Sequence, residues 1–152
     1  MKVGVFLNYI GLGANLLHLS YCHQIAKIYG PITLISLSKN LDQALEDDEL
    51  IHEVKIFEKN KNVIDIPKFS SNLKGLNLDC IYIFYPSARI YLAAKLAGIK
   101  KVFCYPLFKK KKLHLVEAAK KFTSEHLNIS TCKTETNIQI SKEKINKTKV
   151  HF

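Results

Sequence analysis

The sequence has little of what marks a secreted, zinc-binding or membrane-spanning protein. Its four cysteines are far apart, with no C-x-x-C pair and no histidines at zinc-finger spacing, and they are Cys22, Cys80, Cys104 and Cys132. No run reaches the roughly 18–20 apolar residues of a membrane-spanning helix, and the apolar stretch Met1–Leu7 is too short for a secretory leader. We therefore expect reduced thiols, no metal site, and a cytoplasmic protein that can still work peripherally at the inner face of a membrane.

Acidic residues are scarce in the last third of the chain. Ten Lys or Arg and nine Asp or Glu precede Lys100, whereas Lys100–Phe152 carries thirteen basic and four acidic residues. This basic block favours an anionic partner, such as nucleic acid, a phosphorylated sugar or an anionic lipid surface, although a lysine-rich surface that only aids solubility is the alternative. The block lacks interleaved aromatic residues and any recognition motif, so we expect no nucleic-acid partner.

What is present is a regular alternation of apolar strands and amphipathic helices. The predicted strands are Lys2–Leu7, Ile32–Leu37, Val54–Phe57, Asp79–Tyr85 and Lys101–Tyr105. The predicted helices are Asn15–Tyr29, a short one from Ser38 to Leu45, one that begins near Pro67 and includes Leu76, Ala88–Ala97 and Leu113–Leu127. Five strands that alternate with helices predict an α/β fold, a Rossmann-like parallel sheet with helices on both faces.

A glycine turn follows the first strand. Gly11 and Gly13 match the first two glycines of the dinucleotide-binding pattern G-x-G-x-x-G, but Leu16 stands at the third position. The second predicted strand ends without an acidic residue for a ribose, and no P-loop is present, so we expect no nucleotide cofactor. The turn nevertheless lies where the ligands of open α/β sheets bind, at the carboxyl end of a strand.

The order of several short segments resembles one enzyme family. The segment Ile10–Ser20, with its following helix ending at Gly30, resembles the opening of family 9 glycosyltransferases, the heptosyltransferases of lipopolysaccharide assembly. Further agreement comes from an acidic stretch before Ile51–Val54, and from the segments Leu78–Ile81, Ala93–Lys100 leading to Tyr105, and His114–Glu117. The resemblance covers about Met1–Asn128.

The resemblance implies the amino-terminal half of a GT-B fold, in which this domain holds the sugar acceptor and a second Rossmann-like domain holds the nucleotide-sugar donor. It implies metal-independent, inverting transfer of a sugar to an anionic glycolipid acceptor at a membrane. The family's probable general base, an Asp after the glycine, falls on Ala14, which cannot accept a proton. We expect residues 1–130 to be the acceptor-side domain and 131–152 a linker into an absent donor domain, so that the chain is truncated and inactive alone.

Several residues are candidates for the site. His18 is a stand-in base, although a lone histidine on a helix is more often packed or surface-exposed. Arg89 could clamp a carboxylate or phosphate, or be an ordinary surface residue. The acceptor-binding candidates are Gly11, Gly13, Asn15, Arg89 and the lysines Lys109, Lys110, Lys111 and Lys112. A nucleotide- or anion-binding module without transferase activity is the alternative function.

Overall fold

The computed structural model describes residues 1–58, 65–106, 113–130, 132, 138 and 140. Its elements follow one another as β1 (Val3–Leu7), α1 (Leu12–Leu17), α2 (Leu19–Tyr29), β2 (Ile32–Ser36), α3 (Leu41–Ala44), β3 (Ile51–Ile56), α4 (Ile66–Gly75), β4 (Cys80–Ile83), α5 (Ala88–Leu96), β5 (Lys101–Cys104) and α6 (Leu115–Leu127). The predicted alternation of five strands with helices is therefore confirmed.

The five strands form one parallel sheet in the order β3-β2-β1-β4-β5. The chain first forms one side of the sheet, with β2 and β3 added in turn next to β1, and then crosses to the other side of β1 to add β4 and β5. Strand order thus reverses between β1 and β4, and in open parallel sheets this is the point at which ligands bind, outside the carboxyl ends of the strands.

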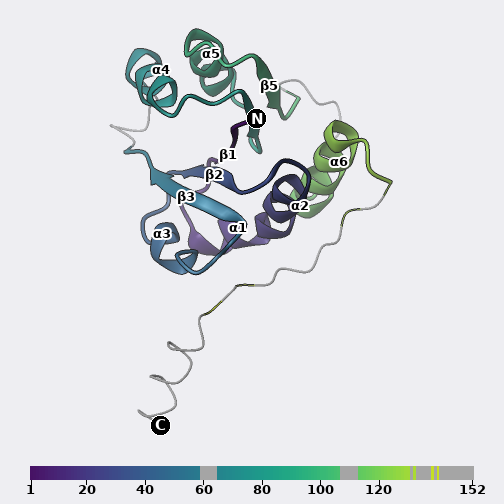
Figure 1. The fold of residues 1–152 in the computed structure, drawn as a ribbon. Coiled ribbons are helices and arrows are strands. Elements are labelled where there is room, and N and C mark those ends of the chain that lie inside the picture. The colour runs from purple at the N-terminus through teal and green to yellow at the C-terminus, as the bar shows by residue number, and fades with distance from the viewer. Residues whose placement is uncertain (59–64, 107–112, 131, 133–137, 139, 141–152) are drawn as a thin grey trace, which may run out of the picture.

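Helices cover both faces of the sheet, with α2 and α6 lying side by side on one face and α4 and α5 together on the other (Figure 1). Alternate residues of β1 serve the two faces, as the period of a strand requires. Val3, Val5 and Leu7 point into the cluster beneath α2 and α6, whereas Phe6 packs beneath α4 and α5.

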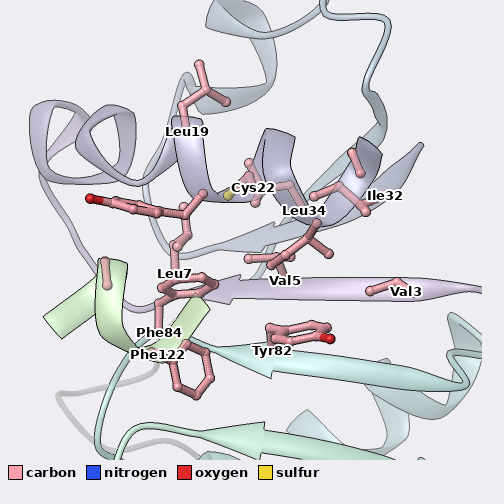
Figure 2. Close-up of a cluster of buried hydrophobic side chains, with 14 of the residues drawn as sticks. Val3, Val5, Leu7, Leu19, Cys22, Ile32, Leu34, Tyr82, Phe84 and Phe122 are labelled. Atoms are coloured by element: carbon pink, nitrogen blue, oxygen red, sulfur yellow. The ribbon is translucent and has the colours of Figure 1, made fainter. Parts of the chain in front are cut away.

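The cluster on the α2 and α6 side is the larger one and is rich in aromatic rings (Figure 2). Phe122 of α6 lies 5.1 Å from Phe84 and 6.2 Å from Tyr82 between ring centroids, both in edge-to-face geometry. Cys132 is buried in the same cluster, where its Sγ lies 3.4 Å from the Ser124 hydroxyl. All four cysteines are free, as predicted.

Three predicted boundaries are wrong. The helix expected as Asn15–Tyr29 begins earlier, at Leu12, and is broken into α1 and α2 at His18, whose N–H bonds to the Asn15 carbonyl three residues back. The third strand begins at Ile51 instead of Val54. The polar residues His52 and Glu53 of this edge strand interrupt the apolar run on which the prediction rested. The short helix α3 starts after Asn40, which adopts a left-handed backbone, and is not capped by Ser38.

The helix expected near Pro67 begins at Ile66, with Pro67 in its first turn. The Ser87 side chain caps α5 by accepting a hydrogen bond from the Ile90 N–H, and Asp65 caps α4 by accepting one from the Lys68 N–H. Gly30 ends α2 with a φ of 90°, which glycine adopts readily. In the described part of the chain, no helix combines the length and apolar character needed to cross a bilayer. The expectations for residues 131–152 fall almost entirely outside the described residues.

Candidate functional site

The glycine turn, residues 8–13, lies at the carboxyl edge of the sheet and runs from the end of β1 into the first residues of α1. Neither Gly11 nor Gly13 has a positive φ, and a Cβ added to either would meet no atom within 4 Å. Packing and backbone conformation within the described chain therefore do not require glycine at these two positions. Their effect is to leave the backbone bare at these two positions, next to the exposed side chains of Ile10 and Leu12.

Asn15 holds the turn from inside. Its side chain is buried, and its amide group donates hydrogen bonds of 2.9 Å to the carbonyls of Tyr9 and Gly11. The side-chain oxygen of Asn15, Oδ1, lies 3.5 Å from the Ser36 hydroxyl at the end of β2 and so joins the turn to the neighbouring strand. Both amide hydrogens are used within the turn, so the structure gives Asn15 a positioning role; a direct contact with an acceptor stays a prediction.

Tyr9 joins the turn to the end of β4. Its hydroxyl donates a 2.9 Å hydrogen bond to the Phe84 carbonyl, and its ring meets the Tyr85 ring edge-on at 6.1 Å between centroids. Burial, with a smaller contribution from Tyr85, raises the pKa of Tyr9 to about 12. The phenol therefore stays protonated at neutral pH and remains a hydrogen-bond donor.

His18 lies beneath the turn and is only 1% exposed. Its ring stacks on Tyr9 at 4.7 Å, and its Nδ1 lies 2.7 Å from the Ala14 carbonyl. A carbonyl can only accept, so Nδ1 carries the proton and Nε2 has the free lone pair that a base needs. Nε2 is buried without a hydrogen-bond partner among the described residues, and burial lowers the pKa of the imidazole. His18 would act as a base only if the turn opened, so its catalytic role stays a prediction.

Ala14 is half-buried in the first turn of α1, on the same short helix as Gly13. Arg89 is exposed in the first turn of α5 and forms no ion pair with any described residue. Because Tyr9 contacts both Phe84 and Tyr85, the glycine turn and the connection from β4 to α5 adjoin at one edge. Lys109, Lys110, Lys111 and Lys112 lie outside the described residues.

Tyr9 and Tyr85 were missed by the sequence analysis. Each is the second residue after an apolar strand that ends at the carboxyl edge, so a search for side chains just beyond the strand ends would have found both. The turn adjoins Tyr85 at this edge, and Arg89 is exposed in the first turn of the helix that follows Tyr85, so the edge offers open backbone, an aromatic ring and a cation. Such a surface suits a polyhydroxylated ligand that carries a negative charge.

The fold is that of known sugar-transferring enzymes, although no protein-family model matches the chain and no curated protein matches it in sequence. The glycosyl transferase of family 9 from Veillonella parvula is 15% identical, with a TM-score of 0.68 over 97% of this chain and 47% of that one. Escherichia coli ADP-heptose lipopolysaccharide heptosyltransferase II is 16% identical, with a TM-score of 0.64 over 100% of this chain and 50% of that one. The Escherichia coli heptosyltransferase WaaC, solved with ADP-2-deoxy-2-fluoro heptose, is 13% identical, with a TM-score of 0.60 over 91% of this chain and 52% of that one.

The chain therefore spans about half the length of the solved structures that it matches. At these identities the likeness is one of fold, and it confirms the fold that the sequence resemblance implied. The 152 residues have the Rossmann-like α/β fold of one half of a GT-B glycosyltransferase of the family 9 type.

Proposed function

We propose that this chain is the acceptor-side domain of a family 9-like glycosyltransferase, which transfers a sugar from a nucleotide-sugar to a lipopolysaccharide or other cell-surface glycan. The observation that carries the proposal is the convergence of the glycine turn, Tyr85 and the first turn of α5 at the point where strand order reverses. Ligands of open α/β sheets bind at this point.

The chemistry of the surface supports an acceptor of this class. Sugar rings pack their apolar faces on aromatic side chains, and Tyr85 is more than one-third exposed beside the turn. The bare backbone at Gly11 and Gly13 leaves room for a ring to approach. Arg89 could form a bidentate pair with a phosphate or carboxylate on the acceptor, and we assign Lys109–Lys112 to the same anionic ligand from the sequence.

The transfer needs a base to remove the proton of the acceptor hydroxyl and a positive field for the leaving phosphate. In the described chain the residue at the position of the family's Asp is Ala14, and the nearest candidate base, His18, is buried. We therefore propose that these 152 residues bind acceptor but do not transfer sugar by themselves, the donor being held by a second domain.

Calorimetry with a deacylated, phosphorylated lipopolysaccharide inner core tests acceptor binding without a membrane. We expect weak binding that falls about tenfold in Arg89→Gln, the loss of one charge-assisted pair, and at least as much in Gly13→Leu, which fills the space above the turn. Lys120→Gln, which removes an exposed charge on α6 at the other face of the sheet, is the control and should bind normally.

Two results would reject the proposal. If Arg89→Gln, Gly13→Leu and Lys120→Gln all bind like the parent, the edge is not the acceptor site. If ADP binds and the glycan does not, the chain is a nucleotide-binding module without transferase activity, which is the alternative function.

A further inference from the structure

The outer face of α5 carries apolar side chains where a surface helix usually carries polar ones. Ile90, Ala93 and Ala94 point inward and are fully buried. On the outside Leu92 is 47% and Leu96 is 62% exposed. These two leucines are four residues apart, so they lie one above the other on the same side of the helix.

Helix α4 beside α5 and helix α6 across the sheet do not share this feature. The exposed residues of α4 include Lys68, Ser71, Asn72 and Lys74, and those of α6 include Glu117, Lys120, Lys121 and Glu125. Polar and charged residues of this kind are those of an ordinary solvated surface. Neither α4 nor α5 contains an acidic residue.

Basic residues surround the exposed leucines. Arg89 and Lys95 belong to α5 itself, and Lys100 and Lys101 follow it directly and are exposed. The Lys95 Nζ lies over the Tyr91 ring, 5.7 Å from its centre, so this charge sits against an exposed aromatic face.

The charge of this side of the molecule is not balanced. Residues 65–106 contain six basic and two acidic residues, and both acidic side chains accept hydrogen bonds from backbone N–H groups, Asp65 from Lys68 and Asp79 from Lys2. Residues 39–58, which include α3 and β3, have the opposite balance of two basic and seven acidic residues. The helices α4 and α5, which lie together on one face of the sheet (Figure 1), therefore belong to a net positive segment of the chain.

We propose that the outer face of α5 docks the protein on the surface of an anionic lipid bilayer. Leu92 and Leu96 would enter the boundary between headgroups and acyl chains, with Tyr91 at the headgroup level, and Arg89 and Lys95 would pair with lipid phosphates. The exposed leucines complement the apolar part of the bilayer, and the basic residues near them complement its anionic headgroups. Within residues 65–106, both acidic side chains accept backbone hydrogen bonds.

This docking goes beyond the proposed function, because binding to a bilayer is a separate property that can be measured without sugar transfer. It would nevertheless serve that function. The first turn of α5 lies at the carboxyl edge of the sheet, so a bilayer on this face would hold the candidate acceptor surface close to lipid headgroups.

The chain contains no tryptophan, so one introduced tryptophan reports on a single place. In the 152-residue chain with Lys109–Lys112 unchanged, Leu92→Trp should shift its emission to the blue on vesicles of phosphatidylglycerol and phosphatidylcholine, and brominated acyl chains should quench it. The matched control is Ile28→Trp, at a position 49% exposed on α2 across the sheet, which should show neither effect.

Co-sedimentation with the same vesicles measures the affinity. Lys95→Gln should weaken binding about fivefold, which corresponds to about 1 kcal/mol for one basic residue near an anionic surface. The paired change Leu92→Gln and Leu96→Gln should weaken it about tenfold or more. Lys120→Gln should have a smaller effect than Lys95→Gln, and unchanged circular dichroism would show that each variant is folded.

The proposal would be overturned if the parent chain did not sediment with anionic vesicles, or if Ile28→Trp responded as Leu92→Trp does. It would also be overturned if the Leu92→Trp emission shifted without vesicles as the protein concentration rises, because this face would then bind a second copy of the chain.

Discussion

At the scale of single residues, the glycines of this chain divide into those that packing requires and those that it does not. A Cβ on Gly4 in β1 would lie 2.5 Å from a methyl carbon of Leu78, whereas Gly13 in α1 has nothing within 4 Å. We expect Gly13→Ala to raise the free energy of unfolding by up to about 1 kcal/mol, since alanine is the better helix former. Denaturant unfolding measures this change.

Gly4→Ala supplies the contrast. It should lower the free energy of unfolding by about 1–3 kcal/mol, the usual cost of an added methyl group in a packed core. If Gly13→Ala destabilised the chain as much as Gly4→Ala does, the turn would need its glycine for folding, and the open space above it would not point to a ligand.

One buried hydrogen bond between His23 and Asp48 ties α2 to the connection between α3 and β3. The His23 Nε2 lies 2.7 Å from an Asp48 carboxylate oxygen, and the other oxygen accepts the Leu50 N–H at 3.0 Å. Because the Asp48 side chain is fully buried, Asp48→Ala should lower the free energy of unfolding by about 3 kcal/mol, leaving His23 and the Leu50 N–H without their acceptor. Chemical denaturation tests this.

The control for that pair is Asp42→Ala, which removes an exposed carboxylate nearby and should change stability by no more than about 0.5 kcal/mol. A double-mutant cycle with His23→Ala isolates the coupling. If Asp48→Ala costs no more than Asp42→Ala, the pair contributes nothing to the fold.

Residues of this kind show where sequence reasoning stops. His18, His23 and Asp48 are separated by up to 30 positions, and only the packing of α2 decides that His18 is buried against Tyr9 while His23 meets a carboxylate. Periodicity places a side chain on a face of its own helix, but its partners on other elements are a property of the tertiary structure.

At the scale of elements, the strands and the sheet were predictable and the helix ends were less so. The apolar runs predict β1 and β4, two of the three interior strands, which are buried on both faces and therefore read as continuous hydrophobic segments. The apolar pattern that predicts one helix continues through His18, so it gives no sign of the break. That break comes from local hydrogen bonds of Asn15 and His18.

In the proposed function, the short helix α1 holds Ala14 at the position of the family's catalytic Asp. In a protein that carries both domains, we expect Ala14→Asp to raise the rate of sugar transfer, because a positioned general base contributes about 10²–10⁴-fold. The backbone there is already helical and Ala14 is only half-buried, so a carboxylate can be added without repacking the core. The measurement is the initial rate of transfer at saturating donor.

The control for this change is Ala14→Asn, which has nearly the same shape and cannot accept the proton at neutral pH. A parent that is already fully active, with no gain in Ala14→Asp, would show that another group takes the proton. His18→Gln in the parent would then test the remaining histidine.

At the scale of the whole molecule, both faces of the sheet are covered and both core clusters are complete within the described residues. This arrangement predicts that the 152-residue chain folds as one cooperative unit, because a single core of this size needs no further domain for its stability. The chain matches about half of each solved neighbour. We therefore expect folding to need only these residues, whereas the proposed sugar transfer would need a second domain as well.

The last prediction concerns the chain tested by itself. In the GT-B arrangement that the fold implies, the donor lies between two domains, and one wall alone can neither orient a nucleotide-sugar nor exclude water from it. We therefore expect one cooperative thermal transition, and no heat of binding when nucleotide-sugars such as ADP-heptose are titrated into the chain. A full-length heptosyltransferase titrated in the same buffer is the positive control. Donor binding or turnover by the isolated chain would reject this expectation, and it would make the glycine turn beside Tyr9 a nucleotide site in its own right.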